Sequence, residues 1–362
     1  MTVKKSKRIF YLDALRAFAI LSVIIVHVYA VTRLHVMSEY GTIPSLRWIF
    51  SQTAGNCFRV GVDLFLMLAG ALSLGRVWTI KEFLAKRIPR IVLPFLFWGF
   101  ITGVIAIILS YYFGFSFLLN FDMNSIVEYM AGVFMATSYG FMPYWFFWMI
   151  LGTYLIMPIF NKWLLHSDLV EAEYFLILWL IVCLFDYTLH INFPVNLTYF
   201  SSPIGFVILG YYLRHTKRRI LNNPYFALAL TLFSAALTIV LVIAFSSASE
   251  FYVFDRYSLL LALEIAGVFL LFKNFYKFNI DLNFNENLKS VFKRIILDIA
   301  KYSYGIYLIQ GLFLCVYVKI VPYYEYYSNF ISIFILIVLS SMVTMYICDK
   351  IPYICNIFIG SK

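Results

Sequence analysis

The chain has 362 residues, of which 63% are hydrophobic, 20% aromatic and only 13% charged. Soluble domains carry roughly 45–50% apolar and about 25% charged residues, so this composition argues against a soluble enzyme, a nucleic-acid-binding protein or a disordered scaffold. The formal net charge of +10 would suit nucleic acid, but the basic residues lie in short gaps between apolar runs. The composition therefore predicts a polytopic membrane protein.

Ten apolar runs are candidates to cross a bilayer, for which about 20 residues are needed. We expect an all-α protein with one membrane domain over 1–362, in which the less apolar stretches 41–56 and 113–141 form loops or interfacial helices. Asp13 and Arg16 interrupt the first run, so we expect it to remain as a membrane helix rather than to be cleaved as a signal peptide. The expected spans are 9–32, 57–75, 90–112, 143–163, 172–190, 199–213, 224–247, 256–275, 301–320 and 327–348.

The distribution of lysine and arginine predicts the orientation of these spans. With the N-terminus in the cytoplasm, the gaps on the cytoplasmic side hold 22 basic residues and the outer gaps hold 4. The remaining two, Arg16 and Arg59, lie within or at the end of a helix. Because positive residues are retained on the cytoplasmic side, both termini are expected there. The orientation of the spans in the membrane then accounts for the excess of basic residues, so a nucleic-acid partner is not needed to explain it.

The cysteines and histidines offer no metal-binding pattern. The five cysteines show no CxxC spacing and lie mostly within apolar runs, and the histidines are scattered. We therefore expect packing cysteines and no metal.

Three ionisable residues, Asp13, Arg16 and His27, lie in the first span. The 11-residue step from Arg16 to His27 is close to three helical turns and about 16 Å, so both side chains share a face, with Asp13 about one turn before Arg16. Such a stripe predicts a polar cavity, in which a neutral histidine could act as a general base. The alternatives are a structural ion pair between Asp13 and Arg16 and a histidine that serves only packing.

A second cluster lies on the second expected span. Arg59 and Asp63 are four residues apart and therefore share a helix face. They indicate either a functional site or a simple interhelical contact.

A third cluster is the basic run that precedes the third expected span. Lys86, Arg87 and Arg90 meet the start of that span, and Pro89 would lie in its first turn, where proline is tolerated. The run is either a loop that fixes topology or a cytoplasmic site for a phosphorylated donor, because arginine binds phosphate in a bidentate manner.

In this order the clusters resemble acyltransferase family 3, a family of integral-membrane enzymes that O-acylate glycans and other extracytoplasmic acceptors. Arg16 and His27 reproduce the family's Arg-x10-His spacing. The matching blocks recur in family order across nearly the whole chain, as YLDALRAFAILSVIIVHV (11–28), GVDLFLMLAGALSLGR (61–76), FLAKRIPRIVLP (83–94), YWFFWMILGTYLIMPIF (144–160) and YSYGIYLIQ (302–310).

The resemblance implies an acyl-CoA donor on the cytoplasmic side and an acceptor hydroxyl within or across the membrane. It implies that His27 is catalytic, that Arg16 is the motif arginine and that Asp63 is the acid of the second block. It also places Arg87 and Arg90 in an element associated with donor binding.

Three positions depart from the pattern of the family. Ala69 stands where a serine is common, Gln310 where the last block commonly ends in histidine, and Pro143 where a histidine or polar residue often precedes the tryptophan.

We therefore expect an O-acyltransferase of a bacterial cell membrane that moves an acyl group, with acetyl as the expected group, from acetyl-CoA to a cell-envelope glycan or lipid-linked sugar. Arg87, Arg90 and the adjacent Lys86 would bind the CoA phosphates. His27 would deprotonate the acceptor, and Arg16 with Asp13 would orient the first helix or line the donor path. The expected partners are this donor, the glycan acceptor and membrane lipids, with a second copy of the chain as a further candidate.

The aromatic residues Tyr144, Trp145 and Trp148 could stack on sugar rings near the outer face, although interfacial aromatic belts account for them equally well. A transporter or flippase is the main alternative function, supported best by Glu264 in the middle of the eighth span. A membrane sensor or binding module is a third.

Overall fold

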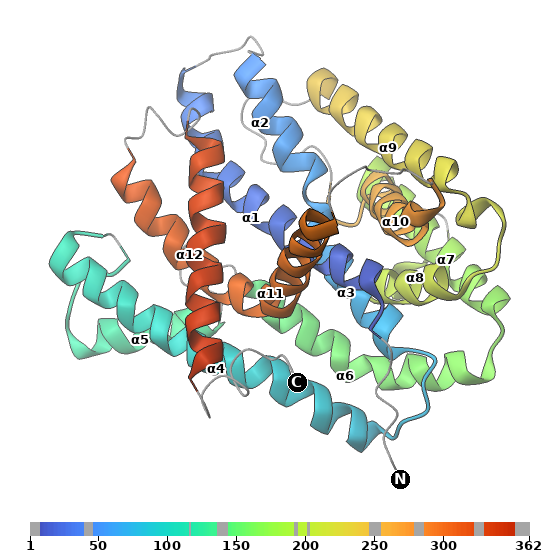
Figure 1. The fold of residues 1–362 in the computed structure, drawn as a ribbon, viewed down its shortest axis with the longest axis horizontal. Coiled ribbons are helices and arrows are strands. Elements are labelled where there is room, and N and C mark those ends of the chain that lie inside the picture. The colour runs from blue at the N-terminus through green and yellow to red at the C-terminus, as the bar shows by residue number, and fades with distance from the viewer. Residues whose placement is uncertain are drawn as a thin grey trace.

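The protein is an assembly of α-helices, seen in a computed structural model (Figure 1). The structure describes residues 8–39, 46–115, 117–135, 144–191, 195–200, 203–245, 255–278, 286–321 and 329–351, and these residues contain no β-strand. The α-helices are α1 (Phe10–Glu39), α2 (Leu46–Cys57), α3 (Val60–Ser73), α4 (Ile80–Phe113), α5 (Met123–Met135), α6 (Trp145–His166), α7 (Leu169–Leu184), α8 (Ile204–His215), α9 (Pro224–Phe245), α10 (Leu259–Asn274), α11 (Glu286–Ile320) and α12 (Phe330–Lys350).

Each of the ten expected spans contains a helix, and eight helical segments in the described residues are long and apolar enough to cross a membrane. The protein is thus an all-helical, multi-pass membrane protein. The helices α7 and α8 are shorter, with 16 and 12 residues. However, α7 continues directly into a π-helical turn, η1 (Phe185–Leu189), so that the pair rises about 32 Å, whereas α8 rises only about 18 Å.

The third expected span begins ten residues earlier than predicted, because α4 starts at Ile80. Thr79 and Glu82 form a capping box: the Thr79 hydroxyl accepts from the Glu82 backbone N–H, and the Glu82 carboxylate accepts from Thr79 N at 2.8 Å. Pro89 therefore lies inside the helix, and its predicted place in the first turn was wrong. The basic run is helical, so its side chains have fixed directions.

Both of the less apolar stretches contain a helix, and the helix at the ninth expected span is longer than predicted. The helix α2 leads almost directly into α3, so that Gln52–Ser73 forms one candidate span, and α5 lies within 113–141. The helix α11 starts at Glu286, 15 residues before the expected span, and the apolar side chains of its first turns are exposed.

The helix α1 lies in the middle of the bundle, in contact with α2, α3, α10, α11 and α12 (Figure 1). Glycines allow its neighbours to approach closely. A Cβ at Gly70 of α3 would overlap the carbonyl oxygen of Val207 on α8, and a Cβ at Gly210 of α8 would overlap the carbonyl of Met67. The two helices thus touch backbone to backbone at two positions.

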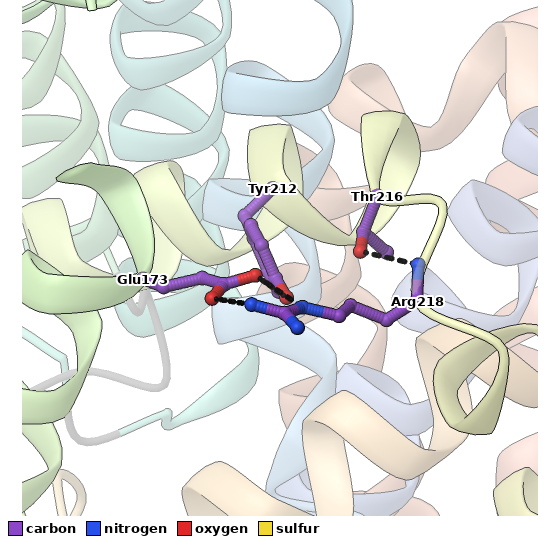
Figure 2. A network of polar contacts seen from close by, with 4 residues as sticks. All are labelled: Glu173, Tyr212, Thr216 and Arg218. Carbon is purple, nitrogen blue, oxygen red and sulfur yellow. Dashed lines mark hydrogen bonds and ion pairs between the residues drawn. The ribbon is translucent and has the colours of Figure 1, made fainter. Parts of the chain in front are cut away.

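A polar network joins α7 to the end of α8 (Figure 2). Arg218 donates to the Glu173 carboxylate from Nε at 3.0 Å and from Nη2 at 2.6 Å, and the Tyr212 hydroxyl donates to the same carboxylate at 2.7 Å. The Arg218 backbone N–H donates to the Thr216 hydroxyl. The hydrogen bonds to Glu173 raise the pKa of Arg218 above its ordinary value.

Candidate functional site

A cavity of about 520 Å³ opens between α1, α3, α4, α6 and α11. Its lining is unusual for a membrane protein because it combines apolar and aromatic side chains with five cations and a single carboxylate. The ionisable residues that line it are Arg8, Arg16, Arg87, Arg90, Lys301 and Asp13. Lys301 is paired with Asp349, and the remaining excess of positive charge makes the electrostatic environment of the cavity favourable for an anion.

Asp13 organises the side of the cavity that α1 forms. Its carboxylate is buried, with 6% of the residue exposed, and accepts a hydrogen bond from Arg8 Nε at 2.6 Å. Arg16 Nη1 lies 3.6 Å from the other carboxylate oxygen. The ion pair between Asp13 and Arg16, one of the two interpretations of the sequence, is therefore present, and it faces the cavity.

The helix α4 supplies Arg87 and Arg90, three residues apart on one face. Arg87 Nη2 donates to the Ser73 hydroxyl at 2.8 Å, which ties it to the end of α3. Arg90 makes no hydrogen bond or ion pair with any residue that the structure describes, and its guanidinium is free to bind a ligand. Lys86 is exposed and does not line the cavity.

Sequence reasoning missed several residues of the cavity. Arg8 and Lys301 were counted only as determinants of orientation, and Tyr154, Tyr304 and Tyr307 were parts of motif blocks without an assigned role. The Tyr304 hydroxyl donates to the carbonyl of Ile91 at 2.7 Å and so joins α11 to α4. The only signal for these residues was their place next to motif residues.

His27 does not line the cavity but lies one helical turn beyond it. Val23 is the last residue of α1 in the lining, and His27 follows four residues later, about 6 Å further along the same face. On α11, Tyr307 is the last lining residue, and Gln310 follows three residues later. The side chain of Gln310 adjoins the imidazole.

Asp63 lies apart from the cavity and is completely buried. Arg256 donates to its Oδ1 from Nη2 at 3.0 Å and from Nε at 3.2 Å, and the same guanidinium lies 4.3 Å from the ring centroid of Trp145. The structure thus places Asp63 of α3 in an ion pair with the turn that precedes α10, and the sequence reasoning did not consider this partner.

The three aromatic candidates for sugar binding differ in exposure, and two of the positions that depart from the family pattern can be compared with the cavity. Tyr144 is fully buried and donates to the Leu308 carbonyl at 3.0 Å, so the idea that it stacks on a sugar is wrong, whereas Trp145 and Trp148 are exposed. Ala69 lines the cavity, and Pro143 lies outside the described residues.

A family model described as an acyltransferase domain matches residues 9–350. The match covers essentially the whole chain and confirms the resemblance found from the motifs. No curated protein and no solved structure matches the chain.

Proposed function

This chain belongs to that acyltransferase family, and from this premise we propose that it transfers an acyl group from acyl-CoA to a hydroxyl of a cell-envelope glycan or lipid-linked sugar. We take acetyl-CoA as the donor and a bacterial cell membrane as the location. The observation that carries the proposal is the cavity lined by arginines.

The charge of the cavity suits the phosphates of coenzyme A. Arg87 and Arg90 come from one helix face, and Arg16 lies close enough to Arg87 for their charges to repel. A polyanion placed between them would relieve that repulsion, and arginine can hold phosphate oxygens in a bidentate manner. We propose Arg87, Arg90 and Arg16 as phosphate ligands and leave out the exposed Lys86.

The arrangement along α1 suits transfer at a distance from the phosphates. His27 is about 16 Å from Arg16 along the helix, a distance comparable to the length of the pantetheine arm of coenzyme A. The arm would pass the apolar and tyrosine side chains of the cavity and present its thioester near the imidazole.

The proposed reaction needs one base. Neutral His27 takes the proton of the acceptor hydroxyl while the oxygen attacks the thioester carbonyl. The carbon–sulfur bond then breaks, and the proton passes to the CoA thiolate, so that an ester and free CoA are the products. Asp13 would hold Arg16 and Arg8 in position through its ion pairs.

We also propose ten membrane spans with both termini in the cytoplasm. This orientation, supported by the division of 22 to 4 basic residues, places the mouth of the cavity at Arg8, Arg87 and Lys301 on the side where acyl-CoA is made. The exposed Trp145 beside Arg256 then lies toward the outer side and is our candidate contact for a sugar ring.

The test measures donor binding and transfer separately. Purified protein in nanodiscs is titrated with CoA, and membranes that contain it are incubated with radiolabelled acetyl-CoA before label is counted in the glycan fraction. We expect each of the substitutions Arg87→Ala and Arg90→Ala to weaken CoA binding by about 1–3 kcal/mol.

The control is Lys81→Ala, which removes an exposed cation from the first turn of α4 and should leave CoA binding unchanged. Equal CoA affinity of a folded Arg87→Ala/Arg90→Ala protein and the control would disprove the donor site. Absence of label in any glycan or lipid fraction would disprove the acceptor class.

A further inference from the structure

Beyond the deep end of the cavity, two neighbouring side chains carry buried polar atoms that have no hydrogen-bond partner among the described residues. They are Nδ1 of His27 on α1 and both amide atoms, Oε1 and Nε2, of Gln310 on α11. Gln310 is 2% exposed. An unsatisfied buried polar group costs about 1–3 kcal/mol, so an arrangement with three such atoms in one place points to a role outside folding.

The helices hold these two residues side by side. Near the cavity mouth, Lys293 of α11 lies 5.7 Å from the ring of Phe10 on α1. His27 and Gln310 each lie 17 residues further along their own helix, a rise of about 26 Å on both. The helices α1 and α11 pack against each other over this length, so Gln310 meets His27 at the depth where the cavity ends.

We propose that Gln310 is a positioning residue for His27. A small rotation of the two side chains lets the Gln310 amide oxygen accept a hydrogen bond from the N–H of the imidazole, so that the other ring nitrogen holds its lone pair toward the cavity. A neutral imidazole has one N–H donor and one acceptor nitrogen, and a fixed acceptor beside the ring selects which nitrogen is protonated. The Gln310 N–H₂ group remains available to donate to an oxygen of the bound substrates.

This inference rests on the proposed function for its catalytic consequence but not for the pairing of the two side chains. The pairing concerns only which nitrogen of His27 carries the proton. The tautomer of His27 can be observed in the protein without any substrate.

The first test is Gln310→Leu, which keeps the volume of the side chain and removes its polar atoms. Its melting temperature is measured beside the kinetics, so that a fall in kcat is distinguished from a loss of folded protein. Its kcat should fall roughly 10- to 100-fold, less than the full loss of about 10²–10⁴-fold expected when a general base is removed, while the KM for acetyl-CoA stays within about twofold. Gln310→Glu, which retains an acceptor oxygen, should recover part of the kcat.

The control is Ser341→Ala on α12, which removes another buried polar atom without a hydrogen-bond partner and should leave kcat and KM unchanged. If the wild-type protein transfers acetyl groups and Gln310→Leu has the same kcat, the inference is wrong and the proposed function stands. If Gln310→Leu does not accumulate, Gln310→Met takes its place.

The second test does not depend on transfer. The protein is labelled with ¹⁵N-histidine in nanodiscs, and the His27 signals are identified by their loss in His27→Ala. We expect one tautomer of His27 in the wild-type protein and a mixture in Gln310→Leu. Identical tautomer signals in both proteins would overturn the inference even if the acyl acceptor proves to be of another class.

Discussion

Two buried aspartates fix arginine side chains at separate places in the bundle. Asp13 holds Arg8 and Arg16 at the cavity, where Arg16 is partly exposed to a ligand. Asp63 holds Arg256 away from the cavity and is itself completely buried. The first carboxylate therefore positions cations in the lining of the cavity, while the second joins two segments that are 193 residues apart in the chain.

Breaking the pair at Asp63 should destabilise the protein. Arg256→Ala leaves the Asp63 carboxylate buried without its cation, and removal of one partner from a buried pair costs about 3–5 kcal/mol. The measurement is unfolding by denaturant in detergent. The comparison variant is Arg218→Ala, which removes an exposed cation from its pair with the partly exposed Glu173 and should destabilise the protein less. Equal stability of the two variants would show that Asp63 does not need Arg256.

His27→Ala should abolish acyl transfer and leave CoA binding intact, because the cavity that we propose as the donor site ends one turn before this residue. In the wild-type protein, activity should rise with pH through the ionisation of the histidine, since only the neutral ring accepts a proton. Rates of label transfer and CoA affinity are measured across pH. A folded His27→Ala protein that transfers label at the normal rate would move the search for a base to Asp63 or Glu264.

At the scale of elements, the closest approach in the bundle joins α3 to α8. Gly70 and Gly210 bring the two backbones into contact, and α8 is almost entirely buried. Because other helices rather than lipid surround α8, a helix that rises only about 18 Å can lie among helices that span the membrane.

Gly70→Ala should therefore be strongly destabilising. The new Cβ would overlap the Val207 carbonyl, and backbone atoms cannot yield as a flexible side chain can. We expect a loss of at least about 1–3 kcal/mol, measured by thermal unfolding. The matched control is Gly152→Ala in α6, where nothing lies within 4 Å of a Cβ, and which should stabilise its helix by up to about 1 kcal/mol. Similar melting temperatures for the two variants would refute the close contact.

At the scale of the whole molecule, the number of spans depends on whether α7 with η1 and α8 cross the membrane. With ten spans, the turn between them faces the outer side. Val195, which is 59% exposed, then becomes accessible there when it is replaced by cysteine in a chain without its native cysteines. An impermeant maleimide should label Val195→Cys on intact cells but not Lys217→Cys, and the reverse pattern would contradict the orientation.

The sequence predicted the helical class and every major helix, because long apolar runs carry a strong signal for membrane spans. It missed the start of α4, because the capping box of Thr79 and Glu82 lies in a polar stretch that reads as a loop. It also missed the Asp63–Arg256 pair, since no local pattern connects residues so distant in the chain. The cavity needed five helices to come together, and of its charged residues the sequence named Asp13, Arg16, Arg87 and Arg90 but not Arg8 or Lys301.

The backbone contact between α3 and α8 also bears on how the cavity can move. Gly61 also brings α3 close to the backbone of Ala19 on α1, so we expect α1, α3 and α8 to move together as one unit. That unit carries Asp13, Arg16 and one wall of the cavity. Any widening that admits a large anion must then come from the opposite wall, where α4 carries Arg87 and Arg90. The helix that binds the anion would also be the part of the entrance that moves.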